Sequence, residues 1–153
     1  MTQDIIRPLR RGDLAAVQAV IAAVDLFPAE MLPEMAAPWL DGSTAALWLI
    51  ADDGTGLAYA APERLTDGTW NLLLLAVDPV RQGQGIGRRL VDAVEKALRA
   101  KGVRLLLVET SGVPGFAGQR RFYTRIGYQR EARIRDYYQP GDDKVIFAKT
   151  LSG

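Results

Sequence analysis

The chain of 153 residues contains neither cysteine nor histidine. Without cysteine it forms no disulfide and offers no thiol nucleophile, and without either residue it has no Cys/His zinc site. Any acid–base chemistry therefore depends on Asp, Glu, Lys, Tyr, a chain terminus or water, because no imidazole is present. We expect no metal cofactor.

The chain also has no long apolar segment. No run reaches the roughly 18 residues that a membrane-spanning helix needs. The first four residues, Met1 to Asp4, lack the basic start and the apolar stretch of a signal peptide. These features lead us to expect a cytoplasmic protein that does not associate with membranes.

The net charge of +1 is unevenly spread along the sequence. Residues 1–76 contain four basic and ten acidic side chains, whereas residues 77–153 contain fifteen basic and eight acidic ones. One interpretation is that the second half binds an anionic ligand and that the first half contributes to binding a cationic one. The alternative is ordinary surface charge, which becomes mixed when the chain folds. Because the net charge is small and no nucleic-acid-binding motif occurs, we expect no nucleic acid partner.

The apolar pattern predicts a single α/β domain with a mixed sheet, because 153 residues with 48% hydrophobic content suffice for one core. Strands are expected at residues 5–9, 45–51, 57–61, 70–77, 103–108, 128–138 and 144–151. Helices are expected after a capping Asp13, in an irregular region around Pro28, Pro33 and Pro38, from 86 to about 100, and from 116 or 117 to 126. The strand–helix–strand order across 70–108 predicts a parallel crossover, and two pairs of neighbouring strands predict hairpins.

Three glycines, Gly83, Gly85 and Gly87, stand between the apolar strand that ends at Val77 and the helix that follows. The first amides of a helix have no partner within it, and the helix dipole places partial positive charge there. Glycine lets the backbone approach a ligand and adopt turns that a side chain would block. The pattern therefore predicts a cradle for a phosphate or pyrophosphate. Further positive charge comes from Arg81, Arg88 and Arg89.

Other glycine-rich phosphate binders fit this segment less well. A dinucleotide fingerprint requires G-x-G-x-x-G, and Arg88 stands where its third glycine belongs. Glu109, at the end of the next strand, is a partial match to the acid of that fingerprint. The P-loop string does not occur, and a purely structural turn is the remaining alternative.

The spacing Gln82-x-x-Gly85-x-Gly87 resembles the acyl-CoA-binding motif of the GCN5-related N-acetyltransferases, the GNAT family. The segments on either side, Val77 to Pro79 and Ile86 to Leu90, are similar to the usual family context. A second segment, Arg121 to Tyr128, resembles the late helix of the family, with phenylalanine–tyrosine followed by glycine and an aromatic residue. The order of the expected elements agrees over nearly the whole chain.

This resemblance implies one N-acetyltransferase domain spanning residues 1–153. The implied fold is α/β (α+β), an acyl-CoA N-acyltransferase fold with a mixed, mostly antiparallel sheet, a central splayed pair of parallel strands and about four flanking helices. It further implies acetyl-CoA as co-substrate, with the pantetheine arm along the backbone of Ala76 and Val77 and near the polar side chain of Ser111. The pyrophosphate is expected on the amides of Gln82, Gly83, Gln84, Gly85, Ile86, Gly87 and Arg88.

By the same resemblance, Tyr123 donates a proton or a hydrogen bond to the departing sulfur, which suits a phenol with a pKa of about 10 facing a thiol with a pKa of about 8.5. The alternative is a core aromatic residue of an amphipathic helix.

The strand before the cradle has no carboxylate, so the general base is expected to be Glu109, which ends the next strand. Glu63 and a water relay are the other candidates. A paired surface carboxylate is the structural alternative for Glu109.

The remaining candidates are less specific. Arg120, Arg121 and Arg125 are expected on a solvated helix face, with the cofactor phosphates as an alternative contact for Arg88 or Arg121. The hairpin with Tyr137, Tyr138, Asp142 and Asp143 borders the acceptor pocket in the family, although Pro-Gly-Asp-Asp is also ordinary turn chemistry.

The expected reaction transfers the acetyl group of acetyl-CoA to a primary amine of a small molecule or an amino-acid derivative. Direct attack in a ternary complex is expected, because no cysteine is present to carry the acyl group. The alternatives are a protein N-terminal or lysine acetyltransferase, a non-catalytic CoA-binding module, and an enzyme that binds another pyrophosphate nucleotide. The sequence leaves open whether the chain is a monomer or a homodimer.

Overall fold

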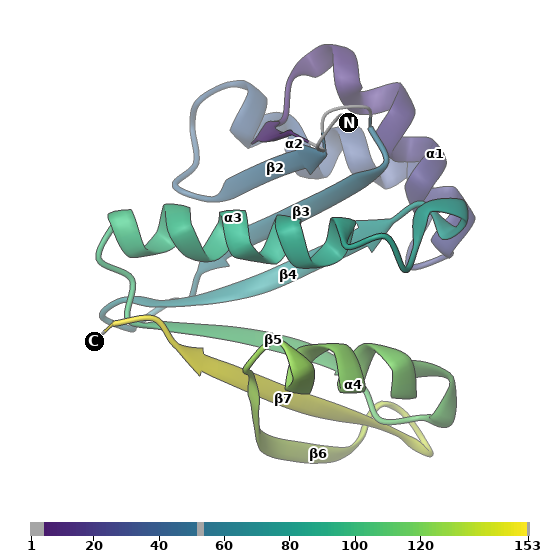
Figure 1. Ribbon diagram of the computed structural model, residues 1–153, viewed down its shortest axis with the longest axis vertical. Helices are drawn as coiled ribbons and strands as arrows, with labels where there is room; N and C mark the ends of the chain where they lie inside the picture. Colours follow the sequence, from purple (N-terminus) through teal and green to yellow (C-terminus); the bar gives the residue numbers. More distant parts are fainter. Residues whose placement is uncertain (1–4, 52–53, 153) are drawn as a thin grey trace. The chain divides into compact units, whose positions relative to one another are not determined.

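The computed structural model describes residues 5–51 and 54–152 and contains a seven-stranded mixed sheet in the order β1-β2-β3-β4-β5-β7-β6 (Figure 1). The strand β4 pairs with β5 in parallel, and the pairs β1–β2, β2–β3, β5–β7 and β6–β7 are antiparallel. The strands are β1 (Ile6–Pro8), β2 (Leu47–Ala51), β3 (Gly56–Pro62), β4 (Thr69–Val77), β5 (Leu105–Ser111), β6 (Gln129–Gln139) and β7 (Asp142–Thr150).

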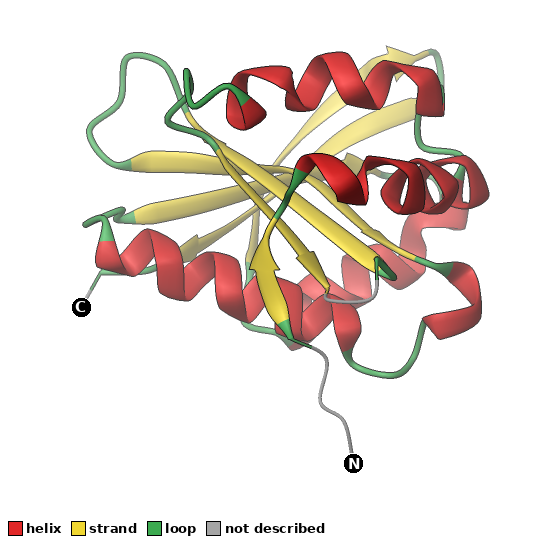
Figure 2. Ribbon diagram, turned by 90° about the horizontal axis from the view of Figure 1, so that it is seen from above, coloured by secondary structure: helices red, strands yellow, loops and turns green. Residues whose placement is uncertain are grey.

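Four α-helices accompany these strands in the described ranges, and Figure 2 distinguishes them by colour. They are α1 (Leu14–Val24), α2 (Leu32–Leu40), α3 (Ile86–Ala100) and α4 (Ala117–Arg125). Short 3₁₀ turns lie at Arg11–Asp13, Ala29–Met31, Pro79–Arg81 and Pro114–Phe116. The predicted mixed sheet, its parallel central pair and its four helices are therefore confirmed.

The boundaries differ from the expected ones by a few residues. The strand expected from residue 103 begins at Leu105, because residues 101 and 102 form the turn that ends α3, where Gly102 has φ +82°. Asp13 is the N-cap residue of α1, as predicted, but its side chain makes no capping hydrogen bond to that helix. Its carboxylate instead forms an ion pair with Arg7 at 2.8 Å and accepts a hydrogen bond from the Arg10 amide, so it fastens β1 to the turn before α1.

The chain divides into two compact units. The first contains the described residues up to Ala61 together with Leu73–Ala97, and β4 enters it at Leu73. Its core lies where α1 and α2 pack on β2, β3 and the end of β4, and the Trp48 ring stacks on Tyr59 with centroids 4.2 Å apart. The neighbouring residues Gly56 and Leu57 point to opposite faces of β3, since side chains alternate along a strand. Leu57 lies in this core, whereas Gly56 faces α3.

The second unit contains Pro62–Leu72 and the residues from Leu98 onward. The parallel ladder runs here from Thr69 opposite Leu105 to Leu72 opposite Val108. β5 then pairs with β7 along its whole length, and β6 and β7 form the predicted long hairpin. β6 is the last strand of the sheet, and each of its residues is exposed.

Candidate functional site

The glycine-rich segment forms a shaped loop at the start of α3. Gly83 and Gly85 have φ of +81° and +85°, a left-handed conformation that favours glycine. Gly87 lies inside the first turn of α3 and needs no such conformation. The two left-handed residues turn the chain from the Pro79–Arg81 turn into the helix, so the motif encodes a specific backbone path.

The amides of this loop are available to a ligand. In the described part of the chain, no backbone carbonyl accepts a hydrogen bond from the amides of residues 83–87. The loop is exposed from Gln82 to Gly85, and a Cβ added at Gly83 would meet nothing within 4 Å. Amides without partners at a helix N-terminus, together with the helix dipole, attract an anion. The sequence prediction of an anion cradle therefore agrees with the backbone geometry.

Side chains around the loop hold it in this path. The Gln82 side chain donates to the Val77 carbonyl at 3.1 Å, and the Arg81 guanidinium donates to the Gln84 side chain at 2.9 Å. Arg89 donates to the Gln84 carbonyl at 3.2 Å. Arg81, Gln82 and Arg89, which were expected to provide charge or ligand contacts, thus also hold the loop in place. Arg88 is exposed in the first turn of α3.

β4 shows an uncovered apolar side chain just before the cradle. Leu73 is 51% exposed although β4 is the fourth of seven strands in the sheet, whereas Ala76 is buried. Leu73 therefore presents an apolar side chain to solvent on this strand. The exposure of Leu73 could not be predicted from the sequence, because Leu73 lies within a run of four leucines.

Tyr123 is buried in the second unit. Its side chain is 7% exposed and makes edge contacts with Phe122 and Tyr128 and a tilted contact with Phe147, with ring centroids 5.3 to 5.9 Å apart. Burial raises the pKa of the Tyr123 phenol well above its usual value of 10. The phenol therefore stays protonated at neutral pH, as a proton donor must.

Glu109 forms an ion pair rather than standing free. Its carboxylate lies 3.0 Å from the Lys144 ammonium of β7, which in turn lies 4.2 Å from the centre of the Tyr137 ring. Burial works to lower the pKa of Lys144, but the Glu109 carboxylate outweighs it, and the pKa is raised overall. Lys144 was missed by sequence reasoning, since only the register of β5 with β7 brings it to Glu109.

Ser111 is buried at the end of β5, and its hydroxyl donates to Asp142 while accepting from the Val113 amide at 3.2 Å. Arg120 donates to the carbonyls of Ser111 and Val113 at 2.7 and 2.9 Å. The expectation of a merely solvated Arg120 is therefore wrong, because this guanidinium ties α4 to the loop after β5. Ser111 and Asp142 likewise join β5 to the hairpin.

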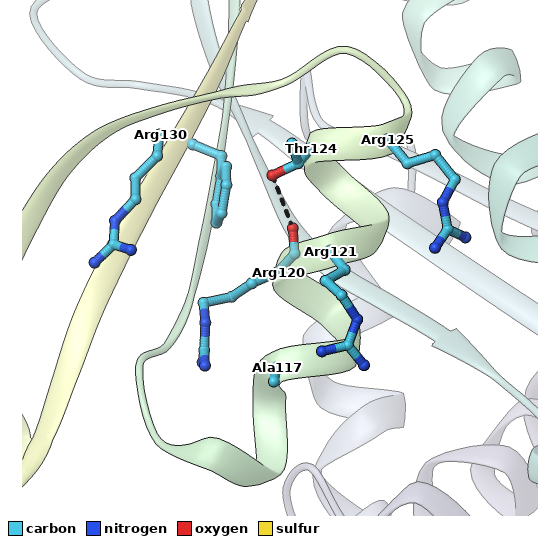
Figure 3. A pocket seen from close by; sticks show the side chains of 7 residues that line it. Ala117, Arg120, Arg121, Thr124, Arg125 and Arg130 are labelled. Atoms are coloured by element: carbon cyan, nitrogen blue, oxygen red, sulfur yellow. Dashed lines mark hydrogen bonds between the residues drawn. The ribbon is translucent and has the colours of Figure 1, made fainter.

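A shallow groove of about 470 Å³ lies against α4 (Figure 3). Four arginines line it, three from α4 and one from β6, and Phe147 of β7 lines it as well. Arg121 and Arg125 are exposed as expected, and no carboxylate of the described ranges forms an ion pair with either. The lining residues are Ala117, Arg120, Arg121, Thr124, Arg125, Arg130 and Phe147.

Two further polar residues meet where β3 leads into β4. Asn71 is 3% exposed, and its side-chain amide donates to the Glu63 carboxylate at 2.9 Å. Glu63 was a candidate base in the sequence, but Asn71 was overlooked within its apolar strand. The available signal was that a strand of this kind otherwise has no polar side chain between Trp70 and Val77.

Comparison with known proteins places this chain in a family. The model of the acetyltransferase (GNAT) domain matches residues 43–130, more than half of the sequence. The chain belongs to the GNAT acetyltransferase family. The matched range of this GNAT chain includes the cradle, Glu109 and Tyr123.

Individual relatives agree with this assignment. A protein from Desulfovibrio desulfuricans assigned to the GNAT acetyltransferases has a crystal structure with a TM-score of 0.91 and 33% identity, over 98% of this chain and 100% of that one. A mycothiol acetyltransferase of Kineococcus radiotolerans is 33% identical over 71% of this chain and 34% of its own length. A second, from Beutenbergia cavernae, is 43% identical over 42% of this chain and 22% of its own length. The chain thus spans about a third or less of the curated relatives it matches.

The residues predicted for the site belong to both units. Ala76, Val77 and residues 82–88 lie in the first unit, and Glu109, Ser111 and Tyr123 lie in the second. In the described ranges no helix is both long and apolar enough to cross a bilayer. Among the same residues, no cluster of three or more acidic side chains is arranged to hold a metal ion.

Proposed function

We propose that this chain is an acetyl-CoA-dependent N-acetyltransferase that acetylates a primary amine of a small molecule or an amino-acid derivative. The observation that supports this most strongly is the row of unpartnered amides at residues 83–87, held by two left-handed glycines at the start of α3. A diphosphate matches that row in charge and in acceptor oxygens. We further propose that residues 1–153 act as one catalytic domain.

Acetyl-CoA fits the residues around the cradle. The diphosphate would lie on the amides of residues 83–87, with Arg88 as a nearby counter-charge. The pantetheine arm would follow the backbone of Ala76 and Val77 beside the exposed Leu73. A structural relative from Salmonella typhimurium, with a TM-score of 0.77 and 19% identity over 99% of this chain and 96% of that one, was solved with acetyl-CoA. Bound acetyl-CoA would supply the activated acetyl group.

The residues of the second unit provide the proton chemistry. Tyr123 would donate its phenol proton or a hydrogen bond to the departing sulfur, since burial raises its pKa and keeps the phenol protonated at neutral pH. Glu109, the base expected from the sequence, lies at the end of β5, and its ion pair with Lys144 would have to open before it could accept a proton. Direct attack by the amine needs no acyl-enzyme intermediate, and the chain has no cysteine to form one.

A small amine is the acceptor that the relatives favour. Two curated relatives are named for mycothiol, and two structural relatives are named for aminoglycosides. Acidic side chains on the β6–β7 hairpin, Asp142 and Asp143, suit a cationic acceptor, although each already has a partner within the chain. We propose that the reaction takes place in the cytoplasm, where the acetyl donor is available.

A thiol-release assay tests the proposal. The chain is incubated with acetyl-CoA and a panel of polyamines, amino acids, aminoglycosides and peptides, and free CoA is measured. We expect release that depends on one class of small amine. Binding of CoA in calorimetry without release across the panel would instead indicate a non-catalytic module, and stronger binding of NAD or ATP than of CoA would reject the assignment.

A further inference from the structure

Asn71 and Glu63 form a polar pair within the second unit. The Asn71 Nδ2 atom donates to the Glu63 Oε1 atom at 2.9 Å. Asn71 is almost fully buried, whereas Glu63 is partly exposed. The pair therefore connects the interior of β4 with a carboxylate that solvent or a ligand can reach.

The chemistry of the pair fixes the orientation of the Asn71 amide. An ionised carboxylate only accepts hydrogen bonds, so the amide must present its NH₂ group to Glu63. The Asn71 Oδ1 atom then points away from Glu63. It is buried, and no donor in the described ranges reaches it. A buried carbonyl oxygen without a donor is unfavourable and calls for an explanation, such as a water or a ligand that fills the position.

The backbone around Glu63 is held rigidly. Its amide donates to the Thr69 carbonyl at 2.8 Å, and the Thr66 hydroxyl donates to the Glu63 carbonyl at 2.8 Å. With its backbone and its carboxylate both fastened, Glu63 keeps a defined position beside Asn71. This preorganisation is typical of residues that take part in chemistry.

The other candidate base is less available. To accept a proton, Glu109 must lose the favourable contact of its carboxylate with the Lys144 ammonium at 3.0 Å. Glu63 has a neutral amide as its partner and loses no charge pairing when it is protonated. The surroundings of the two carboxylates thus favour Glu63 as the group that gains a proton.

We propose that Glu63 is the general base of the acetyl transfer and that Asn71 is its positioning residue. The inference rests on the proposed function. Asn71 Oδ1, which is buried, accepts a hydrogen bond from a water between it and Glu63. Glu63 takes one proton from the ammonium, and the neutral nitrogen then forms a bond to the acetyl carbon as the carbon–sulfur bond breaks. Tyr123 protonates the sulfur and regains a proton from the new amide nitrogen, and Glu63 releases its proton to solvent.

Variants measured between pH 7 and pH 10 test this assignment. In Glu63→Gln we expect kcat/KM to fall about 100-fold at pH 7, within the usual range for a general base. The loss should shrink to less than about threefold near pH 10, because roughly 30% of an alkyl amine with a pKa of about 10.4 is then neutral without a base, against less than roughly 0.1% at pH 7. The exposed Glu131→Gln is the matched control and should follow the wild-type profile.

The Asn71→Leu variant distinguishes a positioning role of Asn71 in catalysis from a role in the stability of the fold. Leucine is close to asparagine in size and removes the buried oxygen without a donor, so the thermal midpoint without ligand should stay level or rise. We expect kcat to fall about 10-fold with little change in KM, and the double variant with Glu63→Gln to be no slower than Glu63→Gln alone. An Asn71→Leu protein that unfolds at lower temperature would show a structural role instead.

The outcomes distinguish the two proposals. Suppose that the wild type releases CoA and that Glu63→Gln either keeps the wild-type kcat/KM or loses the same factor at every pH. This result would overturn the Glu63 assignment and leave the proposed function intact. The same holds if Glu109→Gln, rather than Glu63→Gln, shows the loss that high pH restores. Failure of the wild-type chain to release CoA with any amine would overturn both.

Discussion

Replacement of Gly85 by alanine should weaken CoA binding. Its φ of +85° costs an L-residue about 1–2 kcal/mol, and a new Cβ would lie 3.0 Å from the Arg89 Nη1 atom. The exposed loop can relax in the free protein, so this strain appears when the amides must converge on a ligand. That amount alone corresponds to roughly 5- to 30-fold in the dissociation constant.

A further loss follows from Arg89. If the guanidinium moves away from the new methyl group, its hydrogen bond to the Gln84 carbonyl is disturbed, which costs up to about 1 kcal/mol more. Gly83 has φ +81° but open space around a Cβ, so Gly83→Ala should show the backbone strain alone. We therefore expect Gly85→Ala to bind CoA more weakly than Gly83→Ala.

Calorimetric titration of the folded variants with CoA measures their dissociation constants and so tests this order of affinities. Gly102→Ala is the matched control, because Gly102 has φ +82° and open surroundings but lies at the other end of α3. It should lower the thermal midpoint and leave CoA affinity unchanged. If Gly83→Ala and Gly85→Ala both bind CoA within about twofold of the wild type, the loop amides do not hold the diphosphate and the reasoning is wrong.

Three further predictions concern Tyr123 and Gly56. Tyr123→Phe should lower kcat 10- to 10³-fold while CoA affinity in calorimetry stays near the wild-type value, and undiminished turnover would remove Tyr123 from the mechanism. Burial in the folded protein raises the pKa of Tyr123, so the stabilisation that comes from its protonated phenol is complete below pH 10 and declines as the pH rises further. Between pH 9 and pH 11 the free energy of unfolding in urea should therefore fall less for Tyr123→Phe than for the wild type. A Cβ in Gly56→Ala would lie 2.8 Å from the Leu90 Cδ1 atom, so the free energy of unfolding should fall by about 1–3 kcal/mol in urea, and an unchanged value would contradict the packing of α3 on β3.

Local sequence patterns were sufficient for the elements and for the cradle. Continuous apolar runs predict β4 and β5, and glycines at 83 and 85 predict the two left-handed residues, because these properties depend on neighbours along the chain. The motif also overstated the need for glycine at position 87, which is simply helical. Short-range physics therefore accounts for the part of the site that the backbone builds.

The side-chain partners could not be predicted in this way. Lys144 reaches Glu109 only through the register of β5 with β7, and register depends on packing across the whole sheet. The contact of Asn71 with Glu63 depends on the turn between β3 and β4, in which Leu65 adopts a left-handed φ of +63° that nothing in its residue type suggests. Such contacts determine the surroundings of each carboxylate, so a choice between Glu63 and Glu109 as the base can be proposed only from the fold.

The central claim is that the backbone amides at the start of α3 bind the diphosphate of CoA. An NMR titration of ¹⁵N-labelled protein with acetyl-CoA tests it directly, because the amide resonances of residues 83–87 report on new hydrogen bonds. We predict that these resonances show the largest downfield shifts and saturate together with binding measured by calorimetry. Saturation with CoA that leaves these five resonances in place would contradict the account.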